Sequence, residues 1–225
     1  MVNFITIDDL KNKKRALIFF AFIGALNFII MTIIAMFFYP RPYNFFFDHF
    51  SSLGFLDANW SSQFFGGISR PYLPNPVSPI LFVIALIIAG VAMIPLWIFL
   101  PSQFKECKLA RILSWLGSGA GLISSPFLML VGVPADYNIM LHGIGAMYFF
   151  LFFAIAIIIY VGAILLNKEY PNGYAIFGII VGVVAIAYVF IPFSILNAFH
   201  QKVTVYLFIA WAMVQVFQVW PNLEK

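Results

Sequence analysis

Charged side chains are scarce in this chain of 225 residues: only 9% are Asp, Glu, Lys or Arg. A soluble domain carries about a quarter. Hydrophobic residues make up 64% of the chain, more than a soluble fold hides from water. The 12 Lys and Arg residues are scattered, whereas a nucleic-acid-binding surface gathers them in a stripe. We therefore expect a membrane environment and no nucleic acid among the partners.

Cysteine occurs once, as Cys107. A single thiol excludes an internal disulfide and every cysteine-rich metal or haem-attachment motif. The chain also lacks the HExxH motif of zinc peptidases and the GxSxG motif of serine hydrolases. The sequence therefore requires no cofactor, and no motif indicates an enzyme.

Long charge-free stretches are what the chain has in abundance. Six of them come near the roughly 20 residues that a helix needs to cross a bilayer: residues 16–38, 77–100, 112–133, 139–166, 174–197 and 203–220. In hydrocarbon every backbone polar group must be paired within its helix or in a closed barrel, and the alternating strands of a barrel are absent. We therefore predict an all-α polytopic membrane protein. Residues 1–225 form a single integral membrane domain, with six transmembrane helices in one bundle.

The distribution of Lys and Arg predicts which way the chain faces, because these residues stay on the cytoplasmic side of span ends. With six spans, one side holds nine of them: Lys11, Lys13, Lys14, Arg15, Lys105, Lys108, Arg111, Lys168 and Lys225. The other side holds Arg41, Arg70 and Lys202. This asymmetry predicts a multi-pass protein of the cell membrane with both termini in the cytoplasm.

The longest segment between two predicted spans, residues 39–76, lies on the outer side in this topology. It is rich in proline, which disfavours helix in the residue before it, and in phenylalanine. Aromatic rings gather at the headgroup level of a membrane. We expect this long loop after the first helix to lie against the outer membrane face or to fold back over the bundle.

The stretch FFFDHFSSLG within this loop concentrates polar side chains. Asn44 before it and Gly54 at its end are typical of helix termini, which predicts a short helix over residues 45–53. Three polar side chains of that helix share one face: Asp48, Ser51 and Ser52. His49 points away from this face.

Further polar groups lie on the same side of the membrane. Asp136 precedes the fourth predicted span, where an acid commonly caps the helix. His142 lies within that span, and an ionisable group there calls for a partner. His200 stands at the entrance to the sixth span, beside Gln201 and Lys202, which we interpret as ordinary interface residues.

Three functions of different classes fit these residues. In the first, the polar groups attach the aromatic loop to the bundle and form a polar pocket that binds lipid headgroups at the outer leaflet. The protein is then a lipid-related, accessory or scaffold protein. Its partners are membrane lipids, with a larger membrane complex or a homo-oligomer as further possibilities. We favour this first interpretation.

The second function is an intramembrane metal-dependent hydrolase acting on a lipid. Its metal candidates are Asp48, His142 and His200, which together offer ligands for a zinc-like ion that activates water. Its catalytic candidates are Asp48, Ser51, Ser52 and His142. The third function is electron transfer or a respiratory accessory role, with haem bound by His142 and His200.

Small residues recur at intervals of four in two predicted spans. Gly117, Gly121 and Ser125 lie on one face of the third span, and Gly178 and Gly182 lie on one face of the fifth. Such faces let helix backbones approach closely in membranes. We predict tight helix contacts within the chain, with a dimer interface as the alternative.

The order of these motifs resembles a family of six-span prokaryotic membrane proteins of unknown function, related to the eukaryotic DRAM/FRAG group. The resemblance lies in DHFSSLG after the first span, PNPVSPILF entering the second, VGVPADYNIMLHGIGA joining the third and fourth, and HQKVTVYLFIAW at the last. It covers nearly the whole chain. The family-like residues are Asp48, Ser52, Leu53, Gly54, Asn75, Pro76 and His142.

The family usually has an aliphatic residue at the position of His49, so the resemblance implies no shared role for that histidine. What it implies is lipid-related work at the outer leaflet. It does not imply a catalytic mechanism.

Overall fold

The apolar stretches fold as long helices in the computed structural model, which describes residues 7–60, 70–191 and 197–222, with side chains from 15 to 220 within these ranges. The elements are α1 (Ile7–Phe37), η1 (Phe50–Gly54), α3 (Ser78–Phe99), η2 (Leu100–Gln103), α4 (Lys108–Leu130), α5 (Ile139–Leu165), α6 (Gly173–Phe190) and α7 (Asn197–Asn222). The two η elements are short 3₁₀ helices. The described residues form no strand beyond one isolated bridge between Asp57 and Pro74.

Six of these helices are long and apolar enough to cross a membrane within the described part of the chain, which confirms the predicted all-α polytopic fold. They cover residues 15–37, 78–103, 108–130, 139–165, 173–190 and 197–220. The last two boundaries differ most from the prediction. The fifth span ends at Phe190, and the sixth helix begins at Asn197 instead of residue 203. Its first turns carry polar side chains that bind other parts of the protein, as described below.

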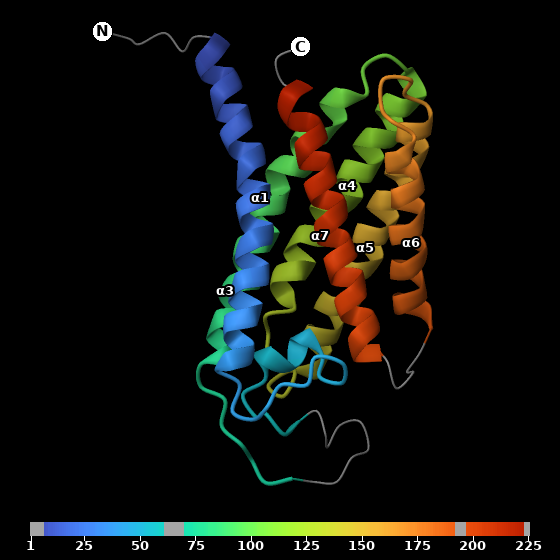
Figure 1. The fold of residues 1–225 in the computed structure, drawn as a ribbon. Coiled ribbons are helices and arrows are strands. Elements are labelled where there is room, and N and C mark those ends of the chain that lie inside the picture. The colour runs from blue at the N-terminus through green and yellow to red at the C-terminus, as the bar shows by residue number, and fades with distance from the viewer. Residues whose placement is uncertain (1–6, 61–69, 192–196, 223–225) are drawn as a thin grey trace, which may run out of the picture.

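The helices form a closed ring in chain order. Each long helix packs against the next, from α1 and α3 through α4, α5 and α6 to α7, and α7 returns to contact α1. Successive helices run in opposite directions, so α1 begins and α7 ends at the same end of the bundle (Figure 1). The described residues between α1 and α3, 38–60 and 70–77, lie at the opposite end, which we call the covered end (Figure 1).

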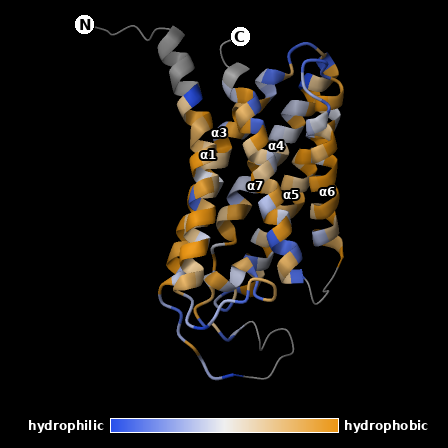
Figure 2. Cartoon of the chain, viewed as in Figure 1, coloured by the Kyte–Doolittle hydropathy of each residue, from blue (hydrophilic) through white to orange (hydrophobic). Residues whose placement is uncertain are grey.

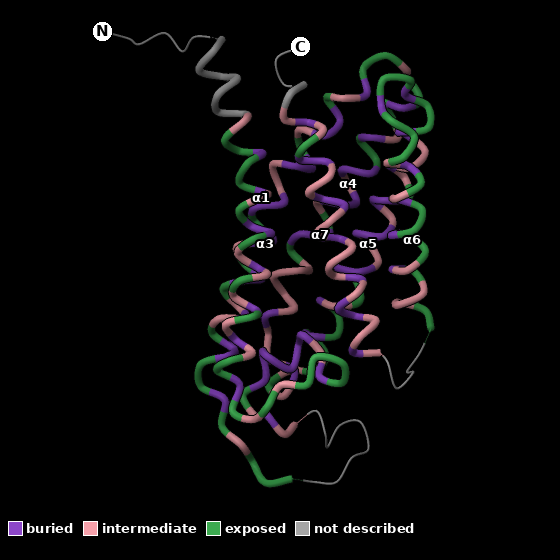
Figure 3. The backbone as a smooth tube through the Cα atoms, in the orientation of Figure 1, coloured by how far each residue is buried: buried purple, intermediate pink, exposed green. Residues whose placement is uncertain are grey.

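Apolar side chains face outward along the whole bundle. Figure 2 shows hydrophobic residues over most of the length of the helices, and hydrophilic ones gathered toward the two ends. Ile80, Trp115, Ile176 and Val183 are each more than half exposed. A monomeric soluble protein rarely exposes such continuous apolar surface. These faces suit the hydrocarbon of a bilayer, and the buried residues lie on the inner sides of the helices (Figure 3).

Glycines set the distance between neighbouring helices, as their spacing predicted. A Cβ atom at Gly117 of α4 would lie 2.8 Å from the ring of Tyr160 on α5, and one at Gly121 would overlap the indole of Trp97 on α3. A Cβ atom at Gly178 of α6 would lie 2.7 Å from Val161 on α5. The predicted tight contacts within the chain are therefore confirmed.

Candidate functional site

Residues 38–60, which follow α1, fold back over the bundle, and we call them the cover segment. The predicted continuous helix over residues 45–53 is wrong. Asn44 does begin a turn, because its Oδ1 accepts from the backbone N–H groups of Phe46 and Phe47 at 3.0 and 3.3 Å. The chain is then extended at His49, and a separate 3₁₀ helix, η1, follows and ends at Gly54. The helix is interrupted because the groups at residues 48–50 bond to distant parts of the chain.

Asp48 forms an ion pair with Arg41 at the start of the cover segment. The two guanidinium nitrogens Nη1 and Nη2 donate to the two carboxylate oxygens at 2.9 and 2.6 Å. The backbone N–H of Asn44 donates to the same carboxylate at 2.7 Å. This pairing raises the pKa of the Arg41 guanidinium above its ordinary value. A bidentate pair of this kind fixes geometry as well as charge, so the cover segment is braced by its own side chains.

Tyr39 and Tyr43 complete this brace. The Tyr39 hydroxyl donates to the carbonyl of Ala58 at 3.0 Å, and the Tyr43 hydroxyl lies 3.0 and 2.9 Å from the carbonyls of Asp48 and His49. Burial raises the pKa of both phenols above the ordinary value. Both hydroxyls therefore stay protonated at neutral pH and act as hydrogen-bond donors.

Lys202 of α7 is completely buried beneath the cover segment. Its Nζ donates to the carbonyl of Asp48 and to the carbonyl of Ala198, the second at 3.4 Å. Three aromatic rings surround the ammonium at 5.2 to 5.3 Å, those of Tyr43, Phe45 and Phe50. The prediction of an ordinary interface lysine is wrong, because the cover segment folds over a side chain that would otherwise extend to the membrane surface.

Lys202 forms no ion pair with any carboxylate of the described residues. It reaches Asp48 only through the backbone carbonyl, while the carboxylate of Asp48 is taken by Arg41. A buried charge is normally paired with an opposite one, since desolvation of an isolated ion is costly. Carbonyl dipoles and ring faces replace that partner here.

Two other side chains of α7 bind the next residues of the cover segment. The imidazole Nε2 of His49 lies 3.1 Å from Oδ1 of Asn197, and the backbone N–H of Phe50 donates to Oε1 of Gln201 at 2.8 Å. Gln201 also donates from Nε2 to the Tyr188 hydroxyl of α6 at 3.2 Å. Gln201 is buried, so its interpretation as an interface residue is also wrong. Asn197, Gln201 and Lys202 together form what we call the α7 latch.

Asp136, which lies between α4 and α5, also binds the cover segment. Its Oδ2 accepts from the backbone N–H of Asp57 at 2.7 Å. Asp136 is therefore not the helix cap that the sequence predicted. Asn138 takes that position, accepting from the N–H of Leu141 at 3.0 Å. The sequence could not show that Asp136 has another role, because its partner Asp57 lies 79 residues earlier in the chain.

Two residues of the PNPVSP stretch bind the cover segment to the start of α3. Asn75 donates from Nδ2 to the carbonyl of Phe55 at 2.9 Å, and Ser78 donates to the carbonyl of Leu53 at 2.8 Å. Gly54, between these carbonyls, lies against the Phe82 ring of α3, where a Cβ atom would come within 2.8 Å. Together with the α7 latch, these bonds hold η1 over the centre of the bundle.

The candidate histidines bind different elements. Nδ1 of His142 lies 2.9 Å from the carbonyl of Val133, and its ring meets that of Phe55 edge to face. Nε2 of His200 lies 3.1 Å from the carbonyl of Val184 on α6. Each imidazole therefore has a backbone partner, which is the usual role of a histidine in a span.

The described residues contain no group of three or more His, Cys, Asp or Glu side chains close enough to hold a metal ion. Asp48, His142 and His200 are consequently not brought together as a ligand set. Asp48, Ser51, Ser52 and His142 do not form one polar pocket either: Asp48 is paired with Arg41 and His142 with Val133.

The two serines have separate environments. Ser52 is fully buried, and its Oγ has no hydrogen-bond partner. Ser51 faces an internal cavity instead, and its side chain forms no hydrogen bond with a described residue. Neither hydroxyl is bonded to an imidazole within the described ranges, so no serine–histidine pair is assembled there.

This cavity has a volume of about 80 Å³, is partly open rather than fully enclosed, and lies beneath η1. Its walls come from α1, α3, α4, α5, α7 and η1. They are apolar throughout, except for Ser51 and Gln201 at the covered end. At the opposite end the cavity reaches Met93, Phe153 and Ala212. It therefore runs inward from the covered end along the axis of the bundle.

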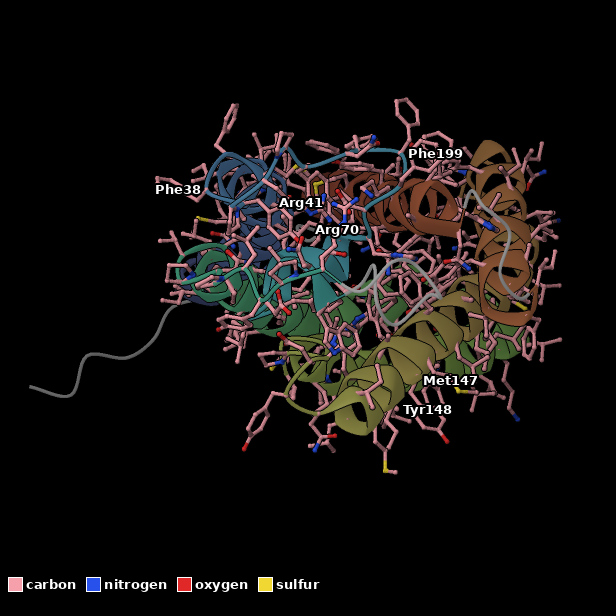
Figure 4. All side chains as sticks on the ribbon, turned by 90° about the horizontal axis from the view of Figure 1, so that it is seen from below. Phe38, Arg41, Arg70, Met147, Tyr148 and Phe199 are labelled. Atoms are coloured by element: carbon pink, nitrogen blue, oxygen red, sulfur yellow. The ribbon has the colours of Figure 1, made fainter. Side chains whose placement is uncertain are left out.

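Figure 4 looks along that axis from the covered end. Arg41 and Arg70 lie over the middle of the bundle, whereas Phe38, Phe199, Met147 and Tyr148 lie at its rim. Two of the cations of the covered end thus lie over the bundle, and large, mostly apolar side chains lie at its rim.

Arg41, Lys202 and Gln201 are the functional candidates that the sequence did not single out. One signal was present: Arg41 and Lys202 are two of only three cations on the predicted outer side, and Arg41 stands among aromatic and proline residues. A cation in such surroundings calls for a partner. The sequence did not reveal the partner of Lys202, the carbonyl of Asp48, because 154 residues separate the two.

A comparison of the chain with protein-family models, curated proteins and solved structures finds no match. Any function must therefore be argued from the geometry of the covered end and the cavity beneath it.

Proposed function

We propose that this protein is a lipid-binding membrane protein with an accessory role at the outer leaflet of the cell membrane. The observation that carries the proposal is the cavity of about 80 Å³ inside the bundle, apolar except for Ser51 and Gln201 at one end. An apolar cavity with a few convergent polar groups is the usual form of a small-ligand site. In a membrane, the abundant molecules with an apolar body and one polar end are lipids.

The proposal places the covered end outside the cell. Of the 12 Lys and Arg residues, eight lie in described segments toward the other end of the bundle, and such residues stay in the cytoplasm. Two of the three Lys and Arg residues at the covered end are also withdrawn from the surface or paired, which strengthens this asymmetry. Lys202 is enclosed and Arg41 is paired with Asp48, which leaves Arg70 as the exposed cation of the three.

The geometry does not support the two alternative functions, a hydrolase and a haem protein. Their candidate ligands and catalytic groups bind separate backbone or side-chain partners. The resemblance to the six-span family related to the DRAM/FRAG group supports lipid-related work, and a relationship to that group is part of the proposal. An accessory role also implies a partner within the membrane, either a larger complex or a second copy of the chain.

Native mass spectrometry of the whole protein, purified in a mild detergent, tests the proposal. We expect lipid to remain bound at a fixed stoichiometry while detergent strips the lipids of the outer surface. The lipids released on denaturation are then identified. Loss of all lipid at the detergent concentration that delipidates the surface would contradict a lipid-binding function.

A further inference from the structure

The amide of Asn27 lies in the middle of the first span without a hydrogen-bond partner among the described residues. Arg15 and Phe37 bound this span, so Asn27 lies about 18 Å from one end and about 15 Å from the other at the helical rise per residue. Its Nδ2 atom is buried and unpaired, and the side chain forms no other hydrogen bond with the described part of the chain. The hydroxyl of Thr32, five residues further along α1, instead bonds to backbone carbonyls of its own helix.

An unpaired amide at this depth is costly, because no water reaches the hydrocarbon of a bilayer to bind it. The side chain of Asn27 is too short to reach the headgroups, as the long side chains of Lys and Arg do. Lipid chains offer neither a donor nor an acceptor. Asn27 is partly exposed and its Oδ1 is not enclosed, so a helix outside the bundle can reach it. Hydrogen bonds of this kind hold helices together in membranes.

Asn27 belongs to a row of residues on the outward side of α1, which lies at the edge of the bundle (Figure 1). The row recurs at alternating steps of three and four residues, the spacing that keeps one side of a helix against a partner helix. We call it the α1 seam, and its members are Phe20, Ile23, Asn27, Ile30, Ile34 and Phe37. Ile23 and Ile30, on either side of Asn27, are 42% and 53% exposed. Ala25 and Phe28 of α1 line the cavity instead.

A second copy of the chain matches this seam. Two copies insert in the same direction, so a two-fold axis perpendicular to the membrane makes their α1 helices parallel and places Asn27 at the same depth in both. An amide carries both a donor and an acceptor, so one Asn27 can donate to the other. In coiled coils a single Asn at such a position fixes the register and the number of helices. The seam is thus complementary to itself.

We propose that the protein forms a homodimer in the membrane through the α1 seam, with a hydrogen bond between the two Asn27 amides at its centre. The dimer supplies the second copy that the proposed accessory role leaves open as a partner, but it does not depend on lipid binding. A dimer that retains no lipid would therefore support this inference and contradict the proposed function. A lipid-bound monomer would do the reverse.

Cysteine cross-linking in native membranes tests the surface. In the full-length chain with Cys107→Ser, the variant Ile30→Cys places a thiol on the α1 seam, and Ile180→Cys places one on α6. The two isoleucines are matched in exposure, at 53% and 52%. We expect oxidation to link two copies of the chain in Ile30→Cys and to leave Ile180→Cys monomeric. Absence of this dimer, equal cross-linking of both variants, or a link from the seam to a different protein would each overturn the inference.

A second measurement tests the amide itself. Dyes on Cys107 report energy transfer between copies in liposomes of phosphatidylcholine and phosphatidylglycerol as the protein-to-lipid ratio is varied. Asn27→Leu keeps a similar size but loses the amide, so we expect the dissociation constant of the dimer to rise at least about threefold. Asn27→Gln, which keeps an amide, should associate more tightly than Asn27→Leu. Equal association of Asn27→Leu and the unmodified protein would overturn the proposed hydrogen bond. Should Asn27→Leu fail to fold, cross-linking of the chain that keeps Asn27 still decides the proposal.

Discussion

Lys202 shows how a buried charge is tolerated at the edge of a membrane. Two backbone carbonyls and three aromatic rings surround its ammonium, and the cover segment excludes solvent from it. A hydrogen bond to a charged group contributes about 1.5–3 kcal/mol, and a desolvated cation–ring contact adds about 2 kcal/mol. The side chain therefore contributes to holding the cover segment on the bundle.

Replacing this charge should loosen the cover segment. In Lys202→Met the side chain keeps its length but loses the ammonium, so we expect backbone hydrogen exchange at residues 44–54 to accelerate at least about tenfold. Mass spectrometry of exchanged peptides measures this. Lys168→Met, at an exposed lysine of the opposite end, serves as the control and should change nothing at residues 44–54. Equal exchange in both variants would contradict the role assigned to Lys202.

His49 makes the closed state sensitive to pH. Burial lowers the pKa of its imidazole below the ordinary value of 6.5, and Lys202 and His142 act in the same direction, against Asn197 and Asp48. When the cover segment opens, the imidazole is solvated and its pKa returns toward 6.5. The closed state therefore has its full stability above pH 6.5 and loses stability as the pH falls below it, because the open state then binds more protons.

We accordingly expect the free energy of opening, from hydrogen exchange corrected for intrinsic rates, to be smaller at about pH 5 than at about pH 7.5. His49→Gln keeps an amide for the contact with Asn197 but does not titrate. Much of the pH dependence should be lost in this variant. A pH dependence as steep as that of the unmodified protein would exclude His49 as its source.

At the scale of elements, glycines determine how closely the helices pack. Gly117 and Gly119 lie on the same helix, α4, yet a Cβ atom at Gly117 would meet Tyr160 of α5, whereas one at Gly119 would meet nothing within 4 Å. The two positions therefore form a matched pair for substitution.

Gly117→Leu should force α4 away from α5 and lower the melting temperature of the purified protein, since overpacking costs about 1–3 kcal/mol. Gly119→Leu should have little effect, because its side chain extends into open space. Thermal unfolding followed by tryptophan fluorescence compares the two variants. Equal melting temperatures would contradict the contact at Gly117.

The sequence predicted the helices well and the cover segment poorly, and the difference has a physical cause. Six charge-free stretches leave no alternative to helices in a membrane, so local composition decides their existence. The form of residues 45–53 depends instead on partners that composition does not reveal. Asp48, His49 and Phe50 are each bonded to α7, at separations of 148 to 154 residues.

The same limit applies to the candidate site. The sequence singled out Asp48 and Ser51 as unusual polar groups in an apolar loop, but their neighbours were not predictable. Asp48 binds Arg41 seven positions earlier, and Ser51 faces a cavity to which five long helices contribute. A cavity results from the packing of distant helices, so no local pattern of residues indicates it.

At the scale of the whole molecule, the single cysteine reports the orientation. Cys107 lies between α3 and α4, at the end where α1 begins and α7 ends (Figure 1). If that end is cytoplasmic, a membrane-impermeant maleimide should label Cys107 only after cells are permeabilised. The variant Tyr72→Cys, combined with Cys107→Ser, places the thiol at an exposed position of the covered end and should be labelled in intact cells. The reverse pattern would invert the proposed orientation.

The α7 latch also determines when, during synthesis, the contacts of the cover segment can be completed. The cover segment follows the first helix and leaves the ribosome early, since chains are made from the N-terminus. Asn197, Gln201 and Lys202, which bind it, belong to the last helix. Until that helix is inserted, the carbonyl of Asp48 and the N–H of Phe50 lack these partners. In chains that stop before α7 the cover segment therefore depends on its remaining bonds, those to Asn75, Ser78 and Asp136.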